Sequence, residues 1–440
     1  MAKHDQLLQS AAQAVDRAKR HGADGVWASA SRVRSLETHL RDGKLERVQH
    51  NTSRGLALRL YVSDRYSTHS TSDLDPTRLD AFVAEAVALT RALEPDTHRK
   101  LPDPALFAGR PTQDLGLWDA QVAEISPEAR LAACEEMNSV SRGQPQVISA
   151  TSIAYDSDFA AASASSNGFS DSWGATSVGL YTQVTMRDEG DAKPADGMGA
   201  SSRRVGDLLA AREIGEEALR RARARLGSKK GPTVVAPMVV DRQAAGRLLH
   251  ALLGPTSAGS IQQGQSFWQG KIGELAVSEK LSIVDDPLVL SGLGSRPFDG
   301  EGIAAKRMPV IERGVLRNYY VDTYYGSKLG LAPTTGSSSN QLVALGAGDL
   351  NRHVADVRSG VYVTSWLGGN SDSTTGDFSF GIRGHLIENG EIAAPVGEMN
   401  VTGNLLQLFS RLRAVGDDPW MYSSLRAPTL VFDDVQFSGA

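Results

Sequence analysis

The stretch VWASASRVRSLETHLRDGKLERVQHNTSRGLALRLYVSDRYSTHSTSD, residues 26–73, decides the fold of the first part of the chain. Apolar and polar side chains alternate along it, which is typical of strands with one buried face. Near its middle, Asp42 and Gly43 separate two such runs, and an Asp-Gly pair tolerates the positive φ angles of a tight hairpin turn. The stretch therefore predicts antiparallel strands joined by a turn at Arg41–Lys44.

Helices are predicted on both sides of these strands. Residues 75–94 have a helical pattern with Pro76 near the first turn, and residues 95–111 are Pro-rich and irregular, as in a linker. We expect an N-terminal α/β domain over residues 1–110. Its first helix is predicted to present one apolar face, made of Leu7, Leu8, Ala11, Ala12, Val15 and Ala18.

A second α/β domain is predicted over residues 111–230. Its first helix begins with Ser126 as candidate N-cap and Pro127 at the first helical position. Strands joined by a turn at Ser166–Gly168 follow, and a helix closes the domain near Gly231. The single cysteine, Cys134, lies within a helical pattern, so we expect it to pack in the core and the protein to occupy a reducing compartment.

From residue 231 to 440 the composition becomes Gly-rich and short-stranded, which predicts a β-rich C-terminal domain with a few helices. Residues 241–254 read as a helix with Asp241 as N-cap and Gly254 just after its end. Hairpins are predicted at IERGVLRN (311–318) and LIENGEIAAP (386–395). The fold class is therefore expected to be α+β, with helices layered on antiparallel sheet in the N-terminal part.

Charge and hydropathy exclude two classes of partner. The 440 residues carry a formal charge of −5, whereas a nucleic-acid-binding surface needs a basic surplus. No apolar run approaches the roughly 20 residues that span a bilayer. We expect a cytoplasmic protein that binds neither nucleic acid nor membrane.

Three stretches of the C-terminal half resemble the TldD/TldE (PmbA) family: LLHALLG (248–254), WQGKIGELAVSEKLSIVDDP (268–287) and GDFSFGIRGHLIENGEIAAPV (376–396). The resemblance extends over essentially the whole chain. It implies a two-subunit metallopeptidase of the bacterial cytosol that trims or matures peptides. In that family TldD carries the zinc, and TldE is a similarly folded partner without it.

This chain departs from the zinc-binding pattern of the family. The resemblance places His250 on the first ligand, Ala251 on the catalytic Glu, Gly254 on a Gly and Pro255 on the second ligand His. The third ligand, a Cys near the C-terminus, is also missing. Catalytic zinc needs about three protein ligands and a base for its water. We therefore expect no catalytic residue and no metal in this chain, with zinc in the partner subunit.

Three interpretations of His250 remain open. It is a vestige or a structural side chain, a hydrogen-bond donor in a peptide groove, or a metal ligand with partners elsewhere. Of the later histidines, His385 lies on a strand pattern where Glu388 would point to the opposite face, so a surface position is expected for it. An acidic pair, Asp417 and Asp418, stands near the place of the missing Cys.

One strand and a group of four tyrosines are the candidate binding features of the sequence. The strand Val361, Tyr362, Val363, Thr364, Ser365 and Trp366 is predicted to hold an extended peptide through its edge. The alternative is an ordinary interior strand. Tyr319 and Tyr320 are expected in the core, and Tyr324 and Tyr325 at a subunit contact.

We expect a zinc-less TldE/PmbA-like subunit that pairs with a TldD-like catalytic chain, shapes the chamber and binds extended or unfolded peptide. The runner-up is an active peptidase subunit with a non-standard site. A third possibility is a stand-alone peptide-binding homodimer. Each hypothesis predicts a different result when metal content, partner binding and peptide cleavage are measured.

Overall fold

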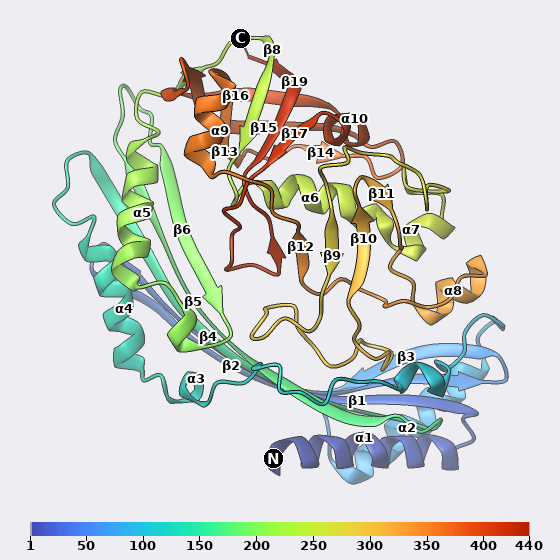
Figure 1. Ribbon diagram of the computed structural model, residues 1–440. Helices are drawn as coiled ribbons and strands as arrows, with labels where there is room; N and C mark the ends of the chain where they lie inside the picture. The colour runs from blue at the N-terminus through green and yellow to red at the C-terminus, as the bar shows by residue number, and fades with distance from the viewer. Residues whose placement is uncertain (1, 440) are drawn as a thin grey trace.

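The computed structural model describes residues 2–439. In it, six antiparallel strands form the sheet on which the first half of the chain is built (Figure 1). Their order is β3-β2-β1-β4-β5-β6. Their bounds are β1 Gly25–Arg41, β2 Lys44–Val62, β3 Arg65–Thr71, β4 Val147–Ser165, β5 Ser170–Met186 and β6 Ala195–Ser202.

The predicted hairpin at Arg41–Lys44 is confirmed. Arg41 pairs with Lys44, and the two turn residues have positive φ angles, 51° for Asp42 and 74° for Gly43. The turn at Ser166–Gly168 is confirmed as well, because it joins β4 to β5. Pairing of β1 with β4 places strands of the two predicted N-terminal domains in one sheet, and the boundary at residue 110 stays a prediction.

One face of this sheet is covered by helices at its two ends. The helices α1 (Ala2–Arg20) and α2 (Pro76–Arg91) pack near one end, and α4 (Pro127–Ser139) and α5 (Ala211–Arg223) near the other (Figure 1). Because alternate residues of a strand share a face, Ala154 of β4 meets the second pair of helices and Ala162 the first. The short helix α3 (Ala120–Glu124) precedes α4.

Most local predictions for these helices hold. Ser126 caps α4 with Pro127 at the first helical position, and Cys134 is fully buried. The apolar face of α1 differs from the prediction, because Ala12 is exposed and Ala14 is buried in its place. Ala14 follows Leu7 by seven residues, two helical turns, and so returns to the same face.

Between the two helical pairs, the covered face of β4 is polar. Asp156 and Asp158 are buried there and meet arginines from two elements, β1 and α4. Arg32 on β1 donates to Asp158 at 2.6 Å, and Arg34 contacts both carboxylates. Arg130 on α4 also donates to Asp156. This ladder of ion pairs holds β1 against β4, and Arg130 joins α4 to it.

The C-terminal unit sits in the concave side of the long sheet (Figure 1). Pairings among β13, β8, β19, β16 and β15 close on themselves, because β15 pairs with both β13 and β16. A smaller sheet has the order β11-β10-β9-β12-β18. The strands are β7 Lys229–Lys230, β8 Val234–Val240, β9 Ile283–Asp285, β10 Met308–Glu312, β11 Val315–Leu316, β12 Gln341–Val343, β13 Ser359–Trp366, β14 Asn370–Ser371, β15 Asp377–Glu388, β16 Glu391–Asn404, β17 Leu412–Val415, β18 Leu425–Arg426 and β19 Leu430–Ser438.

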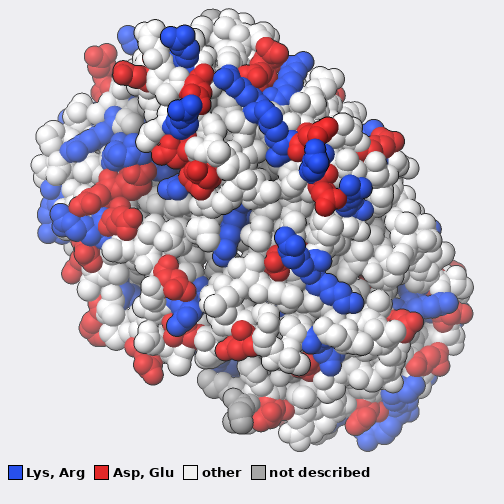
Figure 2. Space-filling view, in the orientation of Figure 1, with Lys and Arg blue, Asp and Glu red and all other residues white. Residues whose placement is uncertain are grey.

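Short helices connect these strands, and the α+β prediction is confirmed. They are α6 Ala245–Leu253, α7 Ala258–Gln262, α8 Thr323–Leu329, α9 Leu350–Val357 and α10 Leu405–Ser410. Both predicted C-terminal hairpins form, with Glu312 opposite Val315 and Glu388 opposite Glu391. None of the helices in residues 2–439 combines the length and apolar character needed to cross a membrane. Acidic and basic side chains are interspersed on the face that Figure 2 shows.

Candidate functional site

The first candidate site lies on α6, the helix that carries His250. Its buried residues pack into the main core of the C-terminal unit, while His250 is exposed, as its position off the apolar face predicted. Ala251 is half-buried and Gly254 is exposed. The buried residues of this helix are Ala245, Leu248, Leu249, Leu252 and Leu253.

The predicted N-cap of α6 is wrong, whereas the helix ends at Leu253, directly before Gly254, as predicted. The N-cap is Ala244, and Asp241 instead accepts from the backbone of Gln243 and from the Tyr362 hydroxyl at 2.6 Å. Gly254 has a φ of −51°, which is right-handed, so it does not end the helix in the left-handed conformation. The chain continues through a 3-10 turn, Gly254–Thr256, before α7 begins.

Side chains from a neighbouring loop satisfy the carbonyl groups at the end of α6. The Trp268 indole donates to the Leu252 carbonyl at 2.7 Å, and the Ser266 hydroxyl donates to the Pro255 carbonyl at 2.6 Å. Trp268 and Pro255 are both buried. Residue 255 is therefore part of a packed helix end, held by hydrogen bonds that a helix terminus needs.

The residues at this position do not fit a zinc ion. Ala251 and Pro255 offer no side-chain lone pair, and His250 alone provides one ligand of the three or so that a catalytic site needs. Within residues 2–439, no group of three His, Cys, Asp or Glu side chains lies close enough together to hold a metal. The residues of this helix therefore do not support zinc-dependent hydrolysis.

The predicted peptide-binding strand is β13, and its two ends differ. Val361–Val363 is buried and pairs with β8 on one edge and β15 on the other, so the interior-strand interpretation is confirmed for these residues. They offer no free edge. The pairing with β8 stops at Val363, and Thr364–Trp366 is half-buried. Peptide binding at β13 stays a prediction that concerns Thr364–Trp366.

The end of β13 meets the start of α6. The Trp366 indole donates to the Ala244 carbonyl at 2.8 Å, and its ring packs on Phe380 with 5.6 Å between ring centroids. The Arg247 guanidinium lies 4.5 Å from the Phe380 ring centroid and donates to the carbonyls of Gly368 and Gly369 at 2.9 Å. The structure therefore brings together two predicted segments that are more than a hundred residues apart.

The four tyrosines singled out in the sequence form two pairs with different surroundings. Tyr319 and Tyr320 are buried, as predicted. Tyr324 contacts the chain's own N-terminal part, because its hydroxyl donates to Asp96 and the Arg99 guanidinium lies 3.3 Å from its ring centroid. The subunit contact expected for Tyr324 and Tyr325 stays a prediction.

The expected surface position of His385 is wrong. This side chain is 8% exposed, since it points toward α5 from β15, and its Nε2 donates to the Ala224 carbonyl at 2.9 Å. Burial lowers the pKa of His385 below its ordinary value. The ring is thus a neutral link between the C-terminal sheet and the end of α5.

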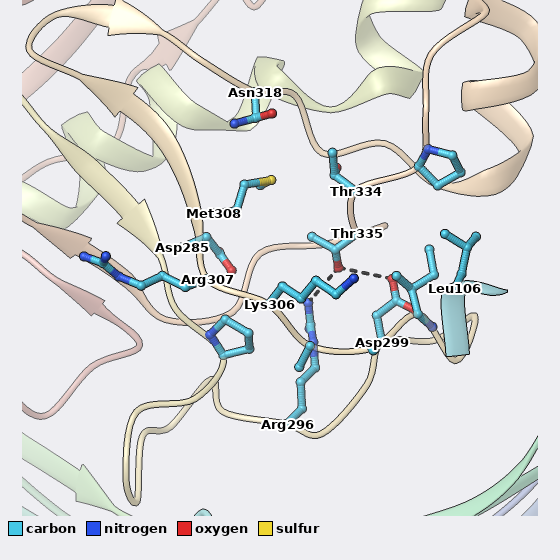
Figure 3. A pocket seen from close by; sticks show the side chains of 15 residues that line it. Leu106, Asp285, Arg296, Asp299, Lys306, Arg307, Met308, Asn318, Thr334 and Thr335 are labelled. Atoms are coloured by element: carbon cyan, nitrogen blue, oxygen red, sulfur yellow. Dashed lines mark hydrogen bonds between the residues drawn. The ribbon is translucent and has the colours of Figure 1, made fainter. Parts of the chain in front are cut away.

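A second candidate is a cavity of about 210 Å³ between loops of the C-terminal unit and Leu106 of the N-terminal part, shown in Figure 3. A chain of hydrogen bonds runs along its wall, from Arg296 to Thr335 at 3.3 Å and from Thr335 to Asp299 at 3.1 Å. Asp299 also accepts from backbone N–H groups, including that of Gly336 at 3.0 Å. Lys306 is exposed at the same cavity.

The Asp285 carboxylate at this cavity is used for hydrogen bonds within the fold. Asp285 accepts from the Tyr320 hydroxyl at 2.9 Å and from the backbone of Ser339 at 2.7 Å, and burial raises its pKa. Three of the lining residues, Pro333, Thr334 and Thr335, lie in a polar loop, and the cavity was not identified from the sequence. The lining residues come from five separated segments, and nothing in a single sequence signals that these segments meet.

Comparisons with known proteins agree on one family. The C-terminal domain of the PmbA/TldA metallopeptidases matches residues 233–439, its domain 1 matches residues 28–90, and its central domain matches residues 121–226. The metalloprotease PmbA of Escherichia coli O157:H7 is 27% identical over 95% of this chain and 93% of its own. A PmbA homologue of Haemophilus influenzae is also 27% identical, over 100% of this chain and 97% of its own.

Solved structures give the same result. A protein of Bacteroides thetaiotaomicron, described in connection with DNA gyrase, is 37% identical with a TM-score of 0.95 over 98% of both chains. TldE from Thermococcus kodakarensis is 18% identical with a TM-score of 0.87, over 98% of this chain and all of its own, and this likeness concerns the fold alone.

Proposed function

The chain belongs to the PmbA/TldD metallopeptidase family, and from that premise we propose that it is the zinc-less, TldE/PmbA-like subunit of a two-subunit peptidase. A TldD-like partner supplies the zinc, the base and the hydrolytic step. This chain shapes the chamber and holds an extended peptide for maturation or degradation in the cytoplasm.

The single observation that carries the proposal is the chemistry of the helix end at residues 250–255. A base must accept a proton from the zinc-bound water, and Ala251 has no group that can do so. Pro255 stands where a second ligand would be, and its carbonyl is held by Ser266 in a buried helix end. This part of the chain supports packing and offers no hydrolytic chemistry.

Peptide binding is assigned to the corner where β13 meets α6. Beyond Val363 the strand continues without β8, so Thr364–Trp366 can pair with extended main chain. Trp366 offers an aromatic surface and Arg247 a cation beside it, and both are half-exposed. Such a corner binds peptide main chain with little dependence on the peptide's sequence.

A mixing experiment tests the proposal. The chain, a TldD-like partner and an equimolar mixture are each incubated with an unfolded peptide, with and without a chelator. We expect cleavage by the mixture only, and its loss when the chelator is added. Metal analysis of the purified chain should give less than stoichiometric zinc.

Two outcomes would favour the alternatives. Cleavage by the isolated chain together with one tightly bound zinc per chain supports an active subunit with a non-standard site. A chain that binds peptide yet forms no complex with the TldD-like partner supports the stand-alone binding protein.

A further inference from the structure

A cleft of about 330 Å³ lies between the end of α5 and the C-terminal sheet. α5 stands beside the C-terminal unit (Figure 1), and the two parts touch where His385 donates to the Ala224 carbonyl at 2.9 Å. Ligand pockets commonly have volumes of about 300–1,000 Å³ and occur preferentially between domains. The size and the place of this cleft therefore suit a small ligand.

Two paired aromatic residues form one wall of the cleft. Tyr362 of β13 lies opposite His385 of β15 in the antiparallel register, and their rings are stacked with 6.2 Å between centroids. Leu350 of α9 and Ile392 of β16 add apolar surface, and Ile392 is 44% exposed. This wall can pack against the apolar part of a ligand.

Three arginines from α5 and from the turn after it also line the cleft. Arg220 and Arg221 each donate to Glu217 at 2.7 Å, so much of their charge is balanced on the helix itself. Arg225 donates to the carbonyl of Ala195. In the described part of the chain, Arg225 forms no ion pair, and its charge is available to a ligand.

The electrostatic surroundings of Arg225 favour an added anion. Burial lowers the pKa of this guanidinium, nearby Arg383 lowers it further, and Asp196 acts in the opposite direction. Arg383 is half-buried, and its side chain donates to no other group among the described residues. Asp241, the second acidic residue of the cleft, already accepts from the Tyr362 hydroxyl at 2.6 Å. A carboxylate beside Arg225 would reduce the repulsion between the two guanidinium groups.

Hydrogen-bond acceptors lie in the same cleft. Because the Nε2 atom of His385 donates to Ala224, the Nδ1 atom of the neutral ring is an acceptor. This atom is buried without a partner among the described residues, in a side chain that is 8% exposed. One oxygen of Asp196 accepts from the backbone of Gly197, and the other accepts from no described group. Buried polar groups are normally hydrogen-bonded, so an unpaired acceptor here points to a ligand that donates an N–H.

We propose that this cleft binds a short peptide by its C-terminal residue. The terminal carboxylate is held by Arg225, with Arg221 beside it, and the adjoining N–H faces Asp196 and His385. The apolar part of the peptide lies on the Tyr362 ring. A C-terminal residue carries a carboxylate and an N–H on neighbouring atoms and uses both sets of groups, whereas a simple anion uses the arginines alone.

The inference goes beyond the proposed function. Thr364 lines the cleft, whereas Trp366 packs toward α6, so the two sites adjoin at β13 but use different side chains. Binding is measured on the chain alone, without a TldD-like partner and without hydrolysis. A chain that binds the peptide but forms no active complex contradicts only the proposed function, and the converse result contradicts only this inference.

Isothermal titration calorimetry of the full chain tests the site. The probes are the dipeptide Ala-Ala, its C-terminal amide and sodium acetate, at equal ionic strength. We expect saturable binding of Ala-Ala at one site per chain, and binding of the amide and of acetate that is weaker by about tenfold or more. Arg225→Gln should weaken Ala-Ala binding about tenfold or more, because it removes a charge-assisted hydrogen bond.

Arg223→Gln is the matched control, since it makes the same substitution at an exposed arginine of α5, and it should bind Ala-Ala like wild type. Circular dichroism and thermal unfolding check that each variant folds. The amide is compared on the unaltered chain, so this arm decides even if Arg225→Gln does not fold. No saturable binding of Ala-Ala at tens of millimolar overturns the proposal. So does an amide or acetate that binds as tightly as Ala-Ala, or a folded Arg225→Gln variant that binds like Arg223→Gln.

Discussion

The indole nitrogen of Trp366 lies 2.8 Å from the carbonyl oxygen of Ala244, and this hydrogen bond joins the end of β13 to the start of α6. The Tyr362 hydroxyl of β13 also donates, at 2.6 Å, to Asp241 in the segment between β8 and α6. The helix with the altered zinc motif and the strand proposed to hold peptide are therefore one rigid corner. A peptide held at Thr364–Trp366 would lie against the N-terminal part of α6.

Trp366→Phe should weaken peptide binding and destabilise the fold slightly. The substitution keeps an aromatic ring on Phe380 but removes the donor to the Ala244 carbonyl. We expect a loss of roughly 1–2 kcal/mol in the free energy of unfolding, from urea titration. Peptide affinity of the complex, from fluorescence anisotropy, should fall several-fold. Trp118→Phe, at an exposed tryptophan, is the control, and equal effects of both variants would contradict the assignment.

His250→Ala should change little. The side chain is exposed and the chain around it lacks a base and a second ligand. We expect the free energy of unfolding to stay within about 0.5 kcal/mol of wild type. The peptidase activity of the mixed complex should stay within a few-fold. A loss of activity by several orders of magnitude would show that His250 has a chemical role after all.

Asp156→Ala should be strongly destabilising. Asp156 is 2% exposed and accepts from Arg34 at 3.1 Å and from Arg130, which is also buried. Removing the carboxylate leaves buried arginine charge without its partner, which costs roughly 3–5 kcal/mol. Chemical denaturation measures this loss. The comparison is Asp80→Ala, whose carboxylate is 47% exposed and whose removal should cost less than about 1 kcal/mol.

The features that could be predicted from the sequence are those that depend on a few neighbouring residues, such as turns and helix caps. The turns at Asp42-Gly43 and Asn389-Gly390 need positive φ angles that few residue types adopt, so the hairpins could be recognised directly. The cap at Ser126 and the helix start at Pro76 follow from equally local chemistry. The exposure of His250 followed from the helical period alone.

Features that depend on distant contacts could not be predicted in this way. Gly254 has the residue type of a helix end, but the Trp268 and Ser266 side chains satisfy the carbonyls there, and the chain goes on in a right-handed turn. His385 alternates like a surface residue, yet α5 covers it. Nothing local to β13 shows that β8 occupies its second edge up to Val363.

Stability should fall below neutral pH, in part through His385. Burial lowers the pKa of this imidazole below its ordinary value of 6.5, so the unfolded chain binds the proton more readily than the folded one. The folded state therefore keeps its full stability above about pH 6.5. It loses stability as the pH falls from there through the lower pKa of the folded protein.

His385→Gln isolates this contribution. Glutamine keeps a side-chain N–H for the Ala224 carbonyl but does not titrate, so it removes the proton uptake while leaving a donor. Thermal unfolding at pH 7.5 and pH 5.5 measures the effect. We expect the difference in melting temperature between the two pH values to be smaller in the variant than in wild type. His4 and His69, whose pKa values burial also lowers, titrate in both proteins and cancel in the comparison. An equal pH dependence in the two proteins would mean that the His385 imidazole is solvated in the folded state, and that the contact with α5 opens in solution.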